Sequence, residues 1–162
     1  MGISNKTNLI IIASGKPKIW DKLPDIGPVK ASEVYTGTFH RLSKAYAVQF
    51  AKEYLILSPK YGFLRPDDIV PTTYDIRFTM KGTGADTIQL EELKAQWQKL
   101  QINPTEQIPM LGGKKFRGLL ASITDNKQSF CFPLEGATGI GVMQQVLKQA
   151  VETNIPLNRT KQ

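Results

Sequence analysis

Apolar residues follow one another without alternation in several short segments of the chain. The two clearest segments are residues 8–13 and 54–57. Such a run is typical of a strand buried on both faces, as in the parallel sheets of α/β proteins. Weaker patterns predict strands over residues 107–111 and 129–132. A short edge strand is predicted over residues 76–80, within a long irregular stretch of residues 63–86.

Apolar residues at spacings of three and four predict helices between these strands. Phe39, Leu42, Tyr46 and Phe50 lie on one face of a helix over residues 38–53. Similar stripes predict helices over residues 88–101 and 115–123, and a last helix that ends near residue 153. The alternation predicts an α/β fold, a three-layer sandwich with helices on both faces of a mostly parallel sheet of about four to five strands. Residues 1–162 are expected to form a single α/β domain with a frayed tail from about residue 156.

Composition and charge narrow the classes of function. Of the 162 residues, 41% are hydrophobic and 22% are charged, as in an ordinary globular protein. No apolar run is long enough to span a bilayer and no secretory signal pattern opens the chain, so we expect a cytoplasmic protein without a membrane partner. The single cysteine, Cys131, excludes an internal disulfide and zinc sites built from cysteine pairs. The net charge of +7 favours a nucleotide or nucleic-acid partner, although a solvated positive face has the same charge.

Each of the four predicted parallel strands ends in a loop of small, basic or turn-forming residues. Ligands of open α/β sheets bind outside the carboxyl ends of the strands, so these loops are expected to share one rim. Glycines before a helix let backbone amides approach an anion, and they also allow a helix to pack closely on a sheet. The candidate ligand-binding residues of the rim are Ser14, Lys16, Lys18, Ser58, Lys60, Gly62, Tyr74, Gly136, Gly139 and Gly141.

Two residues are candidates for catalysis. Asp75 follows Tyr74 in the long loop and is a candidate general base, or it caps a turn. Tyr61 follows a buried strand and is placed to meet a ligand, or it fills the edge of the core. His40 is expected to be exposed at the start of the first helix. One histidine and one cysteine give little material for a catalytic triad or a metal site, so no metal ion and no cofactor are predicted.

The stretch from Leu55 to Pro66, followed by Tyr74 and Asp75, resembles the signature of a bacterial and phage domain family of unknown function. That family is distantly similar to the peroxide-stress protein YaaA. Weaker similarities lie in the order that the family has them, at residues 14–18, 112–116 and 133–141. The chain departs from the family pattern at Pro59, where alanine is usual, and at Phe116, where a tyrosine hydroxyl is lost. The resemblance implies a link to oxidative stress and DNA, with nucleotide or base chemistry at the site.

Together these features predict a YaaA-like α/β protein that binds a nucleotide or DNA at the strand-end rim, with base or glycosidic-bond chemistry as its reaction. Two other functions stay open. One is a non-catalytic nucleic-acid-binding module, and the other is an enzyme that acts on a small phosphorylated metabolite. The sequence leaves open whether the protein is an enzyme, what its ligand is and how many copies assemble.

Overall fold

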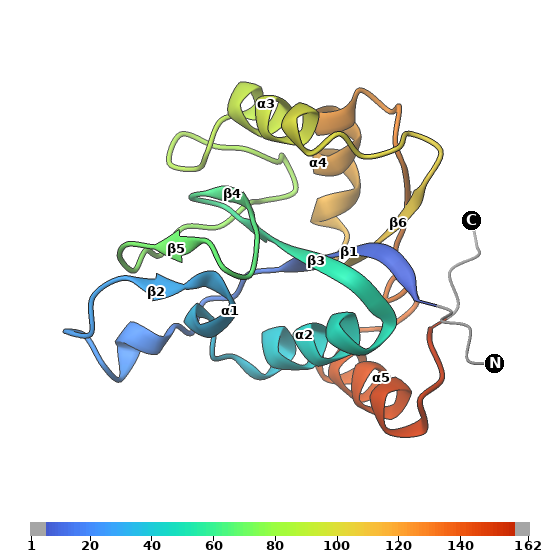
Figure 1. Ribbon diagram of the computed structural model, residues 1–162, viewed down its shortest axis with the longest axis horizontal. Helices are drawn as coiled ribbons and strands as arrows, with labels where there is room; N and C mark the ends of the chain where they lie inside the picture. Colours follow the sequence, from blue (N-terminus) through green and yellow to red (C-terminus); the bar gives the residue numbers. More distant parts are fainter. Residues whose placement is uncertain (1–5, 158–162) are drawn as a thin grey trace.

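A central sheet organises residues 6–157, the part of the chain that the computed structural model describes (Figure 1). Its order is β4-β3-β1-β6-β7, in which β3, β1, β6 and β7 are parallel and β4 is antiparallel to β3. The α/β fold with a mostly parallel five-stranded sheet is therefore confirmed. The strands are β1 (Thr7–Ala13), β3 (Ala51–Ser58), β4 (Gly62–Leu64), β6 (Gln107–Leu111) and β7 (Ser129–Cys131).

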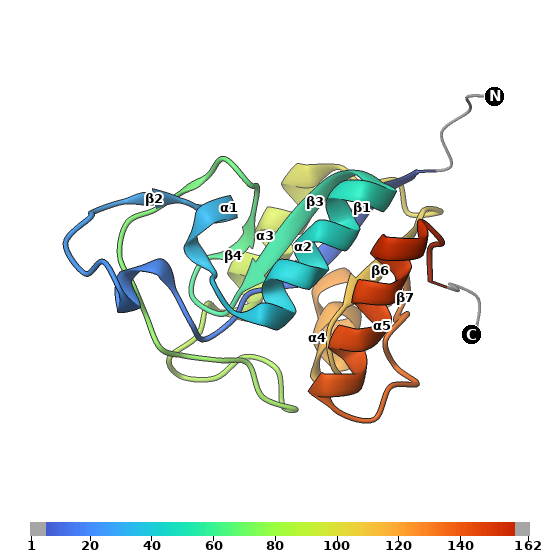
Figure 2. The same ribbon diagram turned by 90° about the horizontal axis from the view of Figure 1, so that it is seen from below.

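Two pairs of helices cover the two faces of the sheet. Figure 2 shows α2 (Thr38–Phe50) and α5 (Ile140–Thr153) side by side on one face. The helices α3 (Leu90–Leu100) and α4 (Lys115–Thr124) cover the other face. Within the described residues, no helix has the length and apolar character that a membrane span requires.

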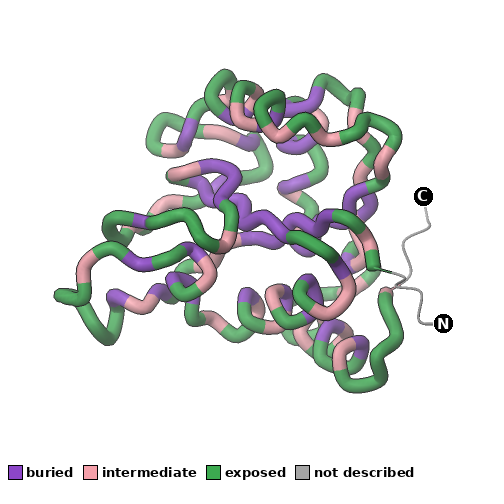
Figure 3. The backbone as a smooth tube through the Cα atoms, in the orientation of Figure 1, coloured by how far each residue is buried: buried purple, intermediate pink, exposed green. Residues whose placement is uncertain are grey.

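The apolar residues at successive positions of β1 allow this strand to be buried on both of its faces. Ile10 and Ile12 pack with the buried residues of α2 and α5, whereas Leu9 and Ile11 pack with those of α3 and α4. Successive side chains of a strand point to opposite faces, so a strand between two helical layers needs apolar residues at every position. Figure 3 shows the buried band that runs through the middle of the fold.

The helix predicted over residues 38–53 is α2, and it is shorter than predicted. It ends at Phe50, and β3 begins at Ala51, which pairs with Thr7 at the start of β1. Pairing along the full length of β1 draws residues 51–53 into the strand, although their local pattern also fits the helix. Long-range strand pairing decides the boundary here.

Residues 63–86 contain more regular secondary structure than predicted. The predicted edge strand over residues 76–80, however, is wrong. The stretch contributes β4 and β5 (Ile69–Val70), and β5 pairs antiparallel with β2 (Val29–Lys30). Residues 76–80 form only an isolated bridge, between Thr79 and Gly82. Phe78 is buried there and meets the ring of Phe116 edge-on, so this segment packs against α4 instead of pairing with a strand. Two short helices, η1 (Ile19–Asp21) and α1 (Ala31–Val34), complete this end of the fold.

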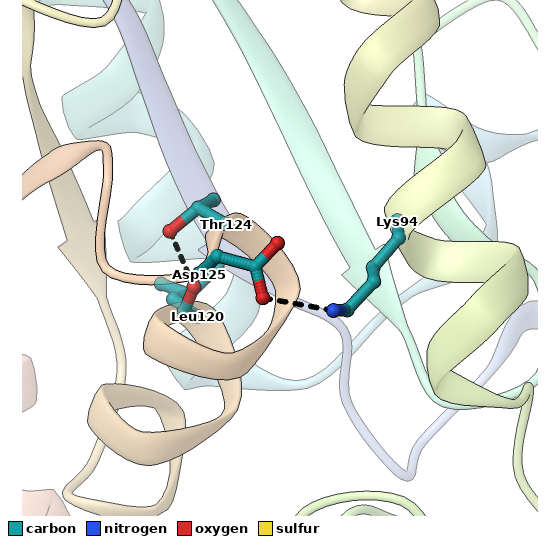
Figure 4. A network of polar contacts seen from close by, with 4 residues as sticks. All are labelled: Lys94, Leu120, Thr124 and Asp125. Carbon is teal, nitrogen blue, oxygen red and sulfur yellow. Dashed lines mark hydrogen bonds and ion pairs between the residues drawn. The ribbon is translucent and has the colours of Figure 1, made fainter.

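An ion pair joins α3 to the end of α4. Figure 4 shows Lys94 of α3 reaching Asp125, with a distance of 2.9 Å between Nζ and Oδ1. Asp125 caps α4 in the left-handed conformation, and the hydroxyl of Thr124 donates to the carbonyl of Leu120 one turn earlier. The Asp125 carboxylate raises the pKa of Lys94, and Lys94 lowers the pKa of Asp125. The pair lies at the surface, where solvent screens it, so it contributes little to stability.

Candidate functional site

The strand order places a switch point between β1 and β6. The chain leaves β1 to form β3 on one side of it, and then returns to form β6 on its other side. Loops at the carboxyl ends of these two strands therefore diverge and leave a crevice, which is where open α/β sheets bind ligands. The predicted shared rim exists, because β1, β3, β6 and β7 all run in the same direction.

A cavity of about 520 Å³ lies at this switch point, and we call it the switch-point cleft. Its volume lies in the range of small-ligand sites, about 300–1,000 Å³. It is built by residues 13–16 after β1, residues 57 and 59 at the end of β3, residues 75–78 of the loop before α3, and residues 112, 113, 115 and 116 after β6. Phe39 of α2 and Ile140 and Met143 of α5 line it on the side of the sheet that these two helices cover. Its aromatic lining residues are Phe39, Phe78 and Phe116.

The charges of the cleft are unbalanced. Lys16, Arg77 and Lys115 line it with a single carboxylate, Asp75. Within residues 6–157 none of these three cations forms an ion pair. The Lys115 Nζ donates to the Phe78 carbonyl at 3.1 Å, and burial, with the nearby charge of Arg77, lowers its pKa. An anion bound beside Lys115 would raise its pKa again, because it stabilises the charged amine and neutralises the repulsion from Arg77.

A buried cluster of hydroxyl groups fixes the loop that carries Asp75. The hydroxyl of Tyr74 hydrogen-bonds with those of Tyr35 and Ser58, the latter at 2.8 Å. Burial raises the pKa of both tyrosines, although hydrogen bonds from Ser58, Tyr35 and Ser14 act in the opposite direction on Tyr74. Tyr74 and Ser58 are thus brought together as predicted neighbours, but neither lines the cleft. They anchor the backbone from which the next residue, Asp75, reaches it.

Lys18 occupies a buried position beneath the same loop. Its Nζ donates to the carbonyl of Lys16 at 3.0 Å and lies 4.3 Å from the centre of the Tyr74 ring. Burial lowers the pKa of Lys18, while Asp75 and Asp21 act in the opposite direction. This lysine therefore supports the turn that presents Ser14 and Lys16, and its own side chain is outside the cleft lining.

The segment from Ser58 to Gly62 forms a tight turn. The Ser58 hydroxyl oxygen accepts the backbone N–H groups of Lys60 at 3.1 Å and Tyr61 at 3.0 Å. Gly62 has a φ of +78°, and the side chain of Gln96 packs directly against its Cα. Lys60 is exposed, and Tyr61 meets the Tyr74 ring edge-on at 5.7 Å. The side chains of Lys60 and Tyr61 are outside the lining of the switch-point cleft.

His40 is buried, so the expectation of an exposed histidine is wrong. Its side chain is 2% exposed, and Nδ1–H donates to the carbonyl of Ala13 at 2.8 Å. Burial lowers the pKa of His40 to about 4, and the hydrogen bond to Ala13 opposes this only in part. The first turn of α2 faces the end of β1 and the ring of Tyr35 instead of solvent. His40 is therefore neutral at pH 7 and part of the scaffold of the cleft.

A second cavity, of about 440 Å³, borders the switch-point cleft. We call it the Arg117 cavity. Its lining includes Gly136 and Gly139, whereas Gly141 is exposed and outside the lining of both cavities. Its other lining residues are Gly112, Gly113, Lys114, Arg117, Phe132, Leu134, Glu135, Ala137, Thr138 and Met143.

Several residues of the site were not among the candidate site residues. Arg77 and Lys115 line the cleft. Arg77 follows the Tyr74-Asp75 pair and Lys115 lies within residues 112–116, so the sequence places both in segments of the family resemblance without marking them individually. Tyr35 offered no local signal, because its partner Tyr74 is 39 residues away. Within residues 6–157 no three histidine, cysteine, aspartate or glutamate side chains come together to hold a metal ion.

Comparison with known proteins places the chain in a family. Residues 21–149 match the family described as "Family of unknown function (DUF6884)". A Bacillus subtilis (strain 168) protein described as "Uncharacterized protein YfjM" is 45% identical over 145 residues, which cover 89% of this chain and 95% of that protein. No solved structure matches the chain. The matched residues include every element of the switch-point cleft except β1 and the loop after it. The chain therefore belongs to DUF6884, a family of unknown function.

Proposed function

We propose that the switch-point cleft binds a nucleotide, free or within a DNA strand, and that the protein hydrolyses its glycosidic bond. The unbalanced charge of the cleft carries the proposal: Lys16, Arg77 and Lys115 face it without ion-pair partners in the described residues. A phosphate is the common biological anion that such a group of cations binds, through short charge-assisted hydrogen bonds. Of the aromatic lining residues, Phe39 is partly exposed, and its ring suits the flat ring of a base.

The single carboxylate of the cleft supports the proposed reaction. Asp75 accepts a proton from a water molecule, whose oxygen forms a bond to C1′ of the sugar. The bond from C1′ to the base nitrogen breaks, its electron pair moves to the base, and the base takes up a proton from solvent. Asp75 suits the role of general base because it is the carboxylate that lines the cleft, and Tyr74, its neighbour, is fixed by Tyr35 and Ser58. Tyr61 has no part in this proposal because its side chain is outside the lining.

Removal of one cation tests the binding step. Lys115→Met is expected to weaken binding of deoxyadenosine monophosphate about tenfold or more, since a hydrogen bond to a charged group contributes about 1.5–3 kcal/mol. Isothermal titration calorimetry at fixed salt measures this. The matched control is Lys127→Met, because Lys127 is exposed beyond the far end of α4. Equal affinities of the two variants, or no binding by the unaltered protein, would contradict a phosphate site in the cleft.

Release of free base tests the chemical step. Chromatography of the same nucleotide after incubation is expected to show adenine with the unaltered protein, and none above background with Asp75→Asn. Because the amide keeps the shape of the carboxylate and removes a negative charge, nucleotide affinity should be kept while the rate is lost. If the unaltered protein binds the nucleotide but releases no base, the hydrolase is wrong and a non-catalytic binding module replaces it.

A further inference from the structure

The Arg117 cavity borders the switch-point cleft. Both cavities are lined by Gly112, Gly113 and Met143. The wall between them carries no side chain at its two glycines. A Cβ at Gly112 would lie 2.6 Å from the Phe116 ring, so a larger residue does not fit there. A Cβ at Gly113 would meet nothing within 4 Å, so the space beside this glycine is free.

The chemistry of the Arg117 cavity differs from that of the cleft. The guanidinium of Arg117 lies 4.4 Å from the centre of the Phe132 ring. Its Nε donates to Oε2 of Glu135 at 3.0 Å, and Nη2 donates to the same oxygen. Glu135 therefore both orients the guanidinium and offsets its charge. Leu134 and Met143 add apolar walls. A flat, oriented guanidinium over an aromatic ring is a surface on which a nucleobase stacks.

We propose that the Arg117 cavity is a second subsite, which holds the base of a neighbouring nucleotide, so that the ligand has two nucleotide units joined through phosphate. The inference rests on the proposed function of the switch-point cleft. Each cavity by itself, at about 520 and 440 Å³, lies in the range that holds one small ligand. Lys114 lines the Arg117 cavity next to the shared glycines, beside the path of the connecting phosphate.

Affinity for one unit and for two units tests the proposal. The probes are deoxyadenosine monophosphate and the 5′-phosphorylated dinucleotide of deoxyadenosine, compared by calorimetry at fixed salt. The dinucleotide is expected to bind about tenfold or more tightly, because one stacked base contributes about 1–3 kcal/mol. A third probe is the oligodeoxyadenylate of eight nucleotides. If it binds more tightly than the dinucleotide, the ligand is a DNA strand, and if the two bind equally, the ligand is a free dinucleotide.

Two variants locate the second unit. Arg117→Ala removes the stacking surface, and Gly136→Leu fills the cavity at a position where a Cβ meets nothing within 4 Å. Both should reduce dinucleotide affinity to about that of the mononucleotide and leave mononucleotide affinity unchanged. The control is Gly84→Leu, at an exposed loop glycine where a Cβ also meets nothing within 4 Å.

The outcomes separate this inference from the function on which it rests. If the mononucleotide binds and the dinucleotide binds no more tightly, the second subsite is wrong and the cleft stands. If the dinucleotide binds more tightly but both variants keep that advantage, the second unit lies elsewhere and the inference is overturned. If neither probe binds, the proposed function itself fails, and the second subsite fails with it.

Discussion

Acidification from pH 7 to below pH 4 is expected to lower the free energy of unfolding by about 3 kcal/mol through His40 alone. Burial lowers the pKa of His40 from 6.5 to about 4, so between these pH values the unfolded chain binds a proton at this histidine and the folded protein does not. The loss begins as the pH falls through 6.5 and is complete below about 4. A difference of one pKa unit corresponds to about 1.4 kcal/mol, which sets the size of the effect.

Urea unfolding at a series of pH values measures this loss, and His40→Asn is its control. An asparagine amide can donate to the Ala13 carbonyl, as Nδ1–H does at 2.8 Å, but it does not titrate. The variant should lose about 3 kcal/mol less than the unaltered protein between pH 7 and 4. Parallel pH profiles of the two proteins would mean that His40 is not buried in its neutral form.

Substitution of Gly62 by alanine is expected to destabilise the protein by about 3–4 kcal/mol. At the φ of +78° an L-residue costs about 1–2 kcal/mol. The new Cβ would also clash with Oε1 of Gln96. Gln96 would have to leave the hydrogen bonds that it makes with Phe63 N–H, at 2.8 Å, and with the Tyr61 carbonyl, at 2.9 Å. Each of these bonds contributes about 1 kcal/mol.

A double-mutant cycle with Gln96→Ala divides this cost. In the Gln96→Ala background the clash is absent, so Gly62→Ala should cost only the backbone part, about 1–2 kcal/mol. Chemical denaturation of the four proteins gives the coupling. Equal costs in both backgrounds would show that the Gln96 side chain does not hold the turn. Gly62 is outside the lining of both the switch-point cleft and the Arg117 cavity.

The layers of the fold could be predicted from the sequence because the signal is local. An apolar run without alternation, such as that of β1, has few meanings besides a strand buried on both faces. The strand over residues 107–111 was predicted with its observed bounds, although Pro109 weakens its pattern. The limit at Phe50 was missed because pairing with β1 extends β3 backwards, and no local pattern records that pairing.

The site could be predicted only in part. The rim follows from parallel strands, so the loops after these strands were expected together, and Ser14 and Lys16 of the first loop line the switch-point cleft beside Asp75. Side chains that meet across the fold give no such signal. Tyr35 meets Tyr74 over 39 residues, and His40 meets the carbonyl of Ala13 over 27 residues. The motif around Ser58 stood out in the sequence, yet its side-chain contacts form a turn and anchor Tyr74.

The most direct test of the account is to locate a nucleotide on the protein. In a nuclear magnetic resonance titration with deoxyadenosine monophosphate, the largest backbone amide shifts should fall on residues 14–16, 75–78 and 112–115, which surround the switch-point cleft. Inorganic phosphate should shift the amides near Lys115 in the same direction. Largest shifts on the outer faces of α2 or α3, or no shifts at millimolar nucleotide, would contradict the account.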